Sequence, residues 1–353
     1  MAKLIGDYPQ VERVETGLWS LDRALAGELK DEKGEVVTTY GVPMTGYEIF
    51  GFQDVGKSTW ATSISGMIAG KLKKDIVYLP MEHVDRDLIG SILYNFDGSC
   101  YILGGWDMAK KFVEAKKSAE VPIPTDEINI DCYLAALRYD DICAGIVDSL
   151  SSIETVSGAE SSSAENNING ARRAKLSSFL AKGINYSRRY RTSPFISFLI
   201  THKTGQIGMF PTNSGSNTTG GEVKKNLSKV RIQLKRVPEK SINDLGHWVI
   251  EGFVEKLSFG KEKNKFYNVV LGGQGVHIGM SALYDCKRLK LASFGKSITM
   301  NGEKYGAMGF VISKALAGDD EFFQPFIDAL KDPSKIAKVD SKEEEDEVWE
   351  GDE

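Results

Sequence analysis

Short apolar runs alternate with longer helical patterns between residues 47 and 200. Residues 47–50, 76–79, 144–147 and 195–200 are almost continuously apolar, which is typical of strands that are buried on both faces. Residues 57–73, directly after the first run, have the length and pattern of a helix. The alternation predicts βαβ units, and we therefore expect an α/β fold with a mostly parallel sheet flanked by helices.

Residues 1–34 precede this pattern as a short lead-in segment. Leu18, Leu21 and Leu25 recur at helical spacing, and residues 27–38 are rich in Glu, Lys, Asp and Gly, as an exposed turn or hairpin is. Leu4 and Ile5 form an apolar patch that is a candidate edge strand for a neighbouring chain, so the segment is expected to serve oligomerisation.

A Gly-rich turn at residues 272–275 separates the last part of the chain from the central pattern. Single hydrophobic cores stop growing near roughly 250 to 300 residues. The chain has 353 residues. We therefore expect an α/β core at 35–270, a small α+β domain at 271–339 and a tail at 340–353.

Two polar segments interrupt the core pattern, at residues 155–170 and 203–219. Both are rich in small side chains and lack periodicity, so we predict loops. Loops of this length are uncommon in compact domains unless they bind a ligand, although two tolerated insertions are the alternative.

Residues 51–58 read Gly-Phe-Gln-Asp-Val-Gly-Lys-Ser and fit the phosphate-loop pattern G-x-x-x-x-G-K-[ST] in full. A predicted strand precedes the loop and a predicted helix follows it, which is the context that the motif requires. We expect Lys57 to reach the β and γ phosphates of ATP and the Ser58 hydroxyl to bind Mg²⁺. The residues expected to surround the nucleotide are Gly51, Phe52, Gln53, Asp54, Val55, Gly56, Lys57, Ser58 and Thr59.

Two carboxylates follow other predicted strands. Asp148 ends the apolar run 144–147, where ligands bind in open α/β sheets, and we expect it to hold Mg²⁺. Glu82 follows the run 76–79 and is the candidate base that deprotonates the attacking water. The alternatives are a strand-end Asp that caps the next segment and a Glu that begins a helix.

The net charge of −5 is unevenly distributed. Residues 340–353 contribute −8, so residues 1–339 carry +3. A solvated, disordered tail is the plainer interpretation, and competition with DNA phosphates for the basic body is the alternative. Four cysteines without C-x-x-C spacing predict neither a zinc site nor disulfides, and the absence of a signal-like start or a long apolar run predicts a cytoplasmic protein without a membrane span.

Several segments in order resemble the RecA family of strand-exchange proteins, and particularly its bacteriophage members. The segments are Val14-Glu15-Thr16-Gly17-Leu18-Trp19-Ser20-Leu21-Asp22, the phosphate loop, Met81-Glu82-His83, Ile146-Val147-Asp148-Ser149, Thr218-Thr219-Gly220-Gly221, Val254-Glu255-Lys256 and Lys261-Glu262-Lys263-Asn264-Lys265-Phe266. The resemblance covers nearly the whole chain. It implies a RecA-type phosphate-loop ATPase core with a small α+β C-terminal domain.

The resemblance also implies roles for individual residues. Residues 155–170 and 203–219 correspond to the two DNA-binding loops, and His202 to the residue that senses the γ-phosphate beside catalytic Glu82 and Lys57. Lys225 and Lys256 match positions that reach the ATP of a neighbouring subunit, with solvated surface lysines as the alternative. The residues expected to contact DNA are Arg172, Arg173, Ile207, Met209, Phe210, Thr219, Gly220 and Gly221. The two arginines belong to a basic run with Lys175, Lys182, Arg188, Arg189 and Arg191, which is equally suited to a solvated helix face.

The function that the resemblance implies is ATP-dependent filament formation on single-stranded DNA, followed by homologous pairing with duplex DNA and strand exchange in recombination and repair. Mediator or single-strand-binding proteins are implied as further partners, reached through the acidic tail. Two alternatives share the phosphate loop: a ring helicase or DNA-packaging motor of the same core fold, and a mediator that loads another recombinase.

Overall fold

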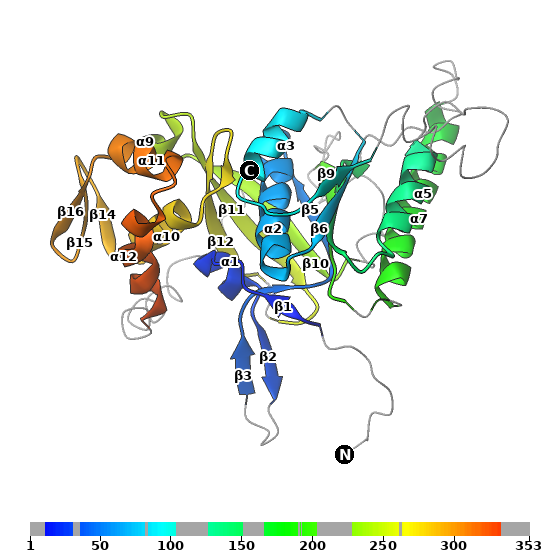
Figure 1. The fold of residues 1–353 in the computed structure, drawn as a ribbon, viewed down its shortest axis with the longest axis horizontal. Helices are drawn as coiled ribbons and strands as arrows, with labels where there is room; N and C mark the ends of the chain where they lie inside the picture. Colours follow the sequence, from blue (N-terminus) through cyan, green and yellow to red (C-terminus); the bar gives the residue numbers. More distant parts are fainter. Residues whose placement is uncertain are drawn as a thin grey trace, which may run out of the picture.

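The structure is a computed structural model, and it describes residues 11–30, 36–81, 84–103, 126–150, 166–189, 191, 193–202, 228–260 and 263–332. Its centre is a nine-stranded sheet with the order β13-β12-β11-β10-β5-β9-β8-β6-β7 (Figure 1). All neighbouring pairs from β10 to β7 are parallel, and the pairs from β10 to β13 are antiparallel. The mostly parallel α/β sheet predicted from the apolar runs is therefore confirmed.

The sheet strands are β5 (Gly46–Gly51), β6 (Asp75–Pro80), β7 (Cys100–Ile102), β8 (Ile142–Asp148), β9 (Ile196–His202), β10 (Val230–Val237), β11 (Trp248–Leu257), β12 (Lys265–Leu271) and β13 (Gly275–Val276). The helices around the sheet are α1 (Trp19–Ala24), α2 (Lys57–Leu72), α3 (Arg86–Ile92), α5 (Asp126–Ala136), α7 (Asn166–Arg189) and α9 (Lys240–Asn243). Strands β5, β6 and β8 contain three of the apolar runs, and β9 begins one residue after the start of the fourth. Helix α2 ends one residue before the predicted end, so these predictions are confirmed to within one residue.

Helices cover both faces of the parallel strands, and the side chains of β6 show how. Ile76 and Tyr78 belong to the hydrophobic cluster under α2, whereas Val77 and Leu79 belong to the cluster under α5 and α7. Successive side chains of a strand point to opposite faces, so a strand that is apolar at every position must be buried on both. This is the physical reason why the continuous apolar runs predicted the parallel strands correctly.

A third hydrophobic cluster lies where β11 and β12 meet the last part of the chain. It combines residues of both strands with α10 (Ile278–Arg288), α11 (Met308–Leu316), α12 (Asp320–Lys331) and the three-stranded sheet of β14 (Ala292–Phe294), β15 (Ile298–Met300) and β16 (Glu303–Gly306). His277 caps α10 by accepting from the Met280 N–H at 3.1 Å and packs edge-on against Phe323. The α+β character expected for this region is present, and the boundary predicted at residue 271 stays a prediction.

The N-terminal part adds two small antiparallel pairs. Strands β1 (Arg13–Val14) and β4 (Val42–Pro43) pair near the core, and β2 (Gly27–Lys30) pairs with β3 (Val36–Thr39) as a hairpin that projects from the body (Figure 1). The hairpin predicted within residues 27–38 is confirmed. The apolar patch at residues 4 and 5 and the acidic tail lie outside the described residues.

The start of α7 corrects one prediction. Residues 166–170 were expected to complete the first polar loop, but the helix already begins at Asn166. Leu180 and Ile184 bury one face of this helix in the core, so tertiary packing at its centre supports polar turns that lack periodicity of their own. The rest of that loop, and all of residues 203–219, lie outside the described residues.

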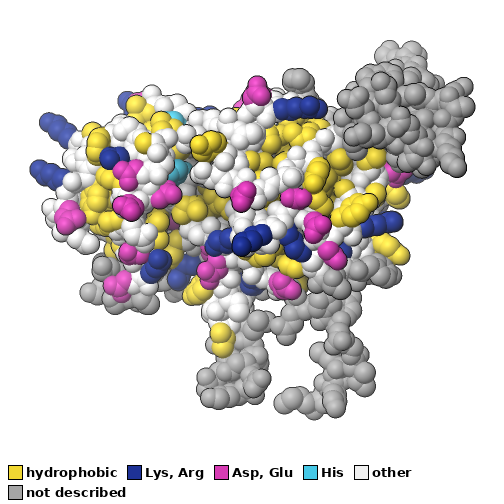
Figure 2. All heavy atoms as spheres, in the orientation of Figure 1, with side chains coloured by type: hydrophobic (Ala, Val, Ile, Leu, Met, Phe, Trp, Pro, Cys, Tyr) yellow, Lys and Arg dark blue, Asp and Glu magenta, His cyan; other side chains and the backbone are white. Residues whose placement is uncertain are grey.

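Hydrophobic side chains gather on the outer part of one face, over α3 and β7 (Figure 2). Leu88, Tyr94 and Tyr101 are the large exposed ones there. Edge strand β7 therefore has an apolar border. No helix among the described residues has the length and apolar character needed to cross a membrane.

Candidate functional site

The loop at residues 51–56 joins the end of β5 to the first turn of α2, in the middle of the sheet. Gly56 is the N-cap of α2, with a positive φ of 91°, and no side chain caps the helix. The first turn contains no acidic residue. The N–H groups at this end and the positive end of the helix dipole are therefore arranged as an anion-binding site requires.

Two glycines hold this loop against neighbouring strands. A Cβ at Gly51 would lie 2.4 Å from the Leu234 carbonyl oxygen of β10. A Cβ at Gly56 would lie 3.1 Å from Trp248 Nε1 and 3.2 Å from Ile250 Cδ1, both on β11. Side chains at these positions would push the loop away from the sheet, so the glycines of the motif are required by packing as well as by backbone conformation.

The side chain of Lys57 is folded over its own loop and is buried. Its ammonium donates to the carbonyl oxygens of Phe52 at 2.6 Å and Gly51 at 3.3 Å. Ser58 and Thr59 follow in the first helical turn and are half-buried, whereas Phe52, Gln53 and Asp54 are exposed at the tip of the loop. Lys57 thus holds a positive charge at the concave side of the turn, where phosphate groups bind in such loops.

Asp148 ends β8 on the same edge of the sheet and is buried. Its carboxylate accepts a hydrogen bond of 2.6 Å from the Tyr78 hydroxyl, and its carbonyl accepts from the Met81 N–H at 2.6 Å. The peptide bond between Asp148 and Ser149 is cis. Because only β9 separates β8 from β5, the ends of the two strands are about 10 Å apart.

Carboxylate and hydroxyl oxygens are the ligands that Mg²⁺ prefers, and Mg²⁺ is usually held by one or two protein groups together with substrate phosphates. Asp148 and Ser58 fit that donor set. The described residues contain no group of three or more His, Cys, Asp or Glu side chains that would form a metal site by themselves.

His202 is the last residue of β9 and pairs in register with Gly51, the first glycine of the phosphate loop. After Gly51 the chain leaves β5 for β6, and after His202 it leaves β9 for β10. Strands β6 and β10 lie on opposite sides of the β5–β9 pair. Ligands of open α/β sheets bind outside the carboxyl ends of strands at such a reversal. Sequence reasoning therefore placed Lys57, Asp148 and His202 on one edge of the sheet, and the structure brings them there.

Below this edge lies a buried charged network that the sequence did not reveal. Arg231 of β10 donates to Glu48 of β5 at 2.7 Å and pairs with Glu255 of β11, and the Thr201 hydroxyl of β9 donates to Glu48 at 3.4 Å. The network ties four adjacent strands together directly below the loop. The alternation of side chains along a strand can predict that such residues are buried. It does not identify their partners on other strands.

Lys256 lies elsewhere. Its ammonium donates to the Ser228 carbonyl at 2.9 Å, before the start of β10 at the amino end of the parallel strands. It is therefore not part of the same chain's phosphate loop. Glu82, Lys225, Ile207, Met209, Phe210, Thr219, Gly220 and Gly221 lie outside the described residues, as do the side chains of Arg172 and Arg173, whose backbone is in α7.

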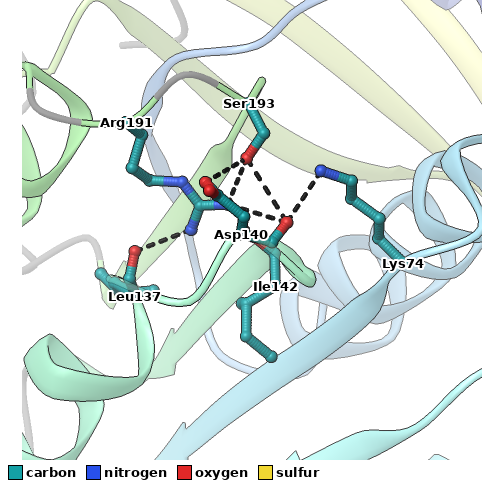
Figure 3. Close-up of polar contacts among 6 residues, drawn as sticks. All are labelled: Lys74, Leu137, Asp140, Ile142, Arg191 and Ser193. Carbon is teal, nitrogen blue, oxygen red and sulfur yellow. Dashed lines mark hydrogen bonds and ion pairs between the residues drawn. The ribbon is translucent and has the colours of Figure 1, made fainter.

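Arg191, which belongs to the basic run considered for DNA contact, has a structural position instead (Figure 3). Its side chain is 3 % exposed and donates to the carbonyls of Leu137 and Ile142 and to the Ser193 hydroxyl. These groups lie at the start of β8 and β9, opposite the phosphate loop. A guanidinium that is used in this way is not available to DNA.

The segment Thr16 to Asp22 also has a structural explanation. The Asp22 carboxylate accepts from the backbone N–H groups of Thr16 and Gly17 and from the Thr16 hydroxyl, all within 3.0 Å. Burial raises the pKa of Asp22, and these hydrogen bonds oppose that rise. The Thr-Gly and Asp positions of this motif thus close a tight turn before α1.

A comparison with models of protein families found no match to this chain, and a comparison with curated proteins likewise found none.

Proposed function

We propose that this chain is an ATP-hydrolysing recombinase of the RecA type, which assembles on single-stranded DNA and pairs it with homologous duplex DNA. The observation that carries the proposal is the phosphate loop at a strand–helix junction, with Lys57, Asp148 and His202 on the same edge of the sheet. This arrangement suits an ATP·Mg²⁺ complex more closely than the loop motif alone does.

In the proposed site, the loop N–H groups and Lys57 bind the phosphates, and Ser58 and Asp148 hold Mg²⁺, which neutralises charge on the phosphate oxygens. Glu82 follows β6, whose end pairs with Asp148, and serves as the base for the attacking water. Tyr78 fixes the orientation of the Asp148 carboxylate through its hydrogen bond of 2.6 Å.

Three observations favour a recombinase over other ATPases of this fold class. The first proposed DNA loop follows the Asp148 strand and the second follows His202, so both begin at the phosphate-binding edge. Lys256 points to the other end of the strands, so any contact with ATP must be made to another chain, as a head-to-tail filament would provide. The small α+β region after β13 completes the implied family organisation.

A ring helicase or packaging motor would share Lys57, Ser58, Glu82 and Asp148 but has no need for the small C-terminal region. A mediator would bind nucleotide without needing Glu82. These alternatives differ from the proposal in a measurable product, because only a recombinase pairs homologous strands and only a helicase unwinds duplex DNA with a direction.

The test is to measure ATP hydrolysis by the full chain with and without single-stranded DNA, and to image the same samples by electron microscopy. We expect filaments with ATP and DNA and a stimulation of roughly 5- to 150-fold, the range of ordinary coupling free energies. Asp148→Asn is the matched control, since it keeps an acceptor for Tyr78 but removes the charge, and it should abolish the stimulated rate. ATP hydrolysis that ignores DNA, together with the absence of homologous pairing, would contradict the proposal.

A further inference from the structure

A polar cavity of about 310 Å³ lies where α1 of the core meets β12 and α10. Its lining includes Trp19, Arg23, Asn264, Lys265, Asp285 and Arg288. A second cavity of about 440 Å³ adjoins it and shares Arg23 and Asn264. The two cavities therefore form one groove that starts at the junction of α1 and α10 and continues toward the β2–β3 hairpin.

Two arginines line this groove, and their guanidinium groups lie over aromatic rings. The Arg288 guanidinium lies 3.6 Å from the ring centre of Tyr267, and the Arg23 guanidinium lies 4.8 Å from that of Trp19 and 5.5 Å from that of Tyr40. Within the described part of the chain, neither side chain donates a hydrogen bond or forms an ion pair. A guanidinium that packs over an aromatic ring keeps its N–H donors for other partners, and two of these donors can bind an oxyanion together.

The other charges around the groove leave it positive. Lys265 adds a third cation to the first cavity. Asp285 is the only carboxyl group in the described lining of that cavity, and burial raises its pKa to about 7. Even when this carboxyl group is ionised, the three cations outnumber it. Glu28 is an exposed carboxylate of the second cavity.

The groove is separate from the phosphate loop. Asp22 of α1 lies within electrostatic reach of Lys71, in the last turn of α2, whereas the phosphate loop precedes the first turn. A helix of 16 residues is about 24 Å long, so the two sites lie at opposite ends of α2.

We propose that this groove is a second phosphate-binding site, in which Arg23 and Arg288 bind phosphate oxygens through their guanidinium edges. Trp19 and Tyr40 pack against the Arg23 guanidinium, and Tyr267 packs against that of Arg288. Arginine forks match phosphate geometry, whereas the cavity walls offer few apolar contacts for an uncharged ligand. The phosphate groups come either from a nucleic-acid backbone or from a free phosphate compound, and two arms of one experiment distinguish these sources.

The first arm uses inorganic tripolyphosphate and isothermal titration calorimetry. The full chain carries Lys57→Ala, so that the phosphate loop does not contribute, and is compared with the same chain that also carries Arg23→Gln or Arg288→Gln. We expect each arginine substitution to weaken binding about tenfold or more, as the loss of a charge-assisted hydrogen-bond pair does.

The second arm uses a fluorescein-labelled 20-nucleotide single strand and fluorescence anisotropy between about 50 and 300 mM KCl. For a backbone contact, each arginine substitution should reduce the slope of log affinity against log salt by about 0.7. Lys304→Gln is the matched control, because it removes one charge from exposed β16 of the same region and should change neither arm. Arg288→Lys keeps the positive charge but removes the fork, and it separates lost binding from lost folding if Arg288→Gln lowers the melting temperature.

A loss in the second arm, with or without the first, identifies a nucleic-acid backbone as the ligand. A loss in the first arm alone identifies a free phosphate compound. Unchanged binding in both arms would overturn the proposal. Neither arm depends on ATP hydrolysis or strand pairing, so failure here is distinguishable from failure of the proposed recombinase function.

Discussion

Two buried cations lie at opposite ends of the parallel strands and are held in different ways. Arg191, before β9, donates to the carbonyls of Leu137 and Ile142 and to the Ser193 hydroxyl at 2.6 to 2.7 Å (Figure 3). Lys57, after β5, donates to the carbonyls of Phe52 and Gly51 in its own loop.

The difference follows from the two side chains. A guanidinium is a rigid planar fork, and its acceptors here belong to the two helix-to-strand connections that it joins, from α5 to β8 and from α7 to β9. An ammonium is a compact charge with three rotatable donors on a flexible stem, so it exchanges one set of acceptors for another at small cost. Burial of a cation therefore does not identify a functional site. The two cations differ in the origin of the acceptors described here, since those of Arg191 join two connections and those of Lys57 belong to its own loop.

The largest expected effect is on stability. Arg191→Ala leaves several buried carbonyl groups without a donor, and we expect the free energy of unfolding to fall by about 3 to 5 kcal/mol. Urea unfolding followed by circular dichroism measures this. Arg138→Ala, an exposed arginine of the neighbouring turn, should change it by less than about 0.5 kcal/mol. Equal effects of the two substitutions would show that the hydrogen bonds of Arg191 do not stabilise the fold.

Lys57→Ala should lower ATP hydrolysis strongly and stability only slightly. We expect ATP hydrolysis to fall by about 100-fold or more, because a positive group aimed at the transferred phosphate is lost. The free energy of unfolding should change by less than about 1 kcal/mol, since the two loop carbonyls become accessible to water. Lys71→Ala, at the exposed end of the same helix, is the control for both measurements. A large loss of stability would show that Lys57, like Arg191, has a structural role.

Asp285 extends the comparison to a buried acid with few donors. It accepts from the Ser20 N–H at 3.3 Å, and burial raises its pKa to about 7. An acid whose pKa is raised by folding contributes fully to stability below its unfolded pKa, and this contribution is lost as pH rises through about 7. Asp285→Asn keeps an acceptor for Ser20, so we expect it to gain about 2 kcal/mol relative to the unmodified chain between about pH 5 and pH 8. Parallel stability–pH curves would contradict this.

The smallest effect on stability is expected for Asp140, which forms an ion pair with Arg191. The Asp140 side chain is 63 % exposed, and its carboxylate lies 3.9 Å from Arg191. Such pairs contribute little, so Asp140→Asn should cost less than about 0.5 kcal/mol in urea unfolding. A loss comparable to that of Arg191→Ala would mean that the ion pair, rather than the carbonyl groups, holds the arginine.

The sequence predicted the features that depend on neighbours along the chain. Strands such as β8 are apolar at every position, and the phosphate loop carries its chemistry in eight consecutive residues, so both were recognisable. The turn between Thr16 and Asp22 was detected as a motif, although its hydrogen bonds were not foreseen.

What the sequence did not predict depends on residues that are distant along the chain. Arg191 was grouped with a basic helix because its acceptors are about 50 positions away and are backbone groups, which leave no mark on residue type. The Arg231–Glu48 pair joins residues 183 positions apart. The groove between α1 and α10 forms only when the core and the last helices pack together. No local pattern therefore predicts that Arg23 and Arg288 line the same cavity.

The pairing of Gly51 with His202 has a mechanical consequence. Adjacent strands are about 4.8 Å apart and are joined by backbone hydrogen bonds, so a small displacement of one strand end is transmitted to the other without any side chain as intermediary. A shift of the loop by a fraction of an ångström therefore moves the position from which residue 203 departs. This coupling depends on the position of the backbone, so substitution of the His202 side chain alone would leave it intact.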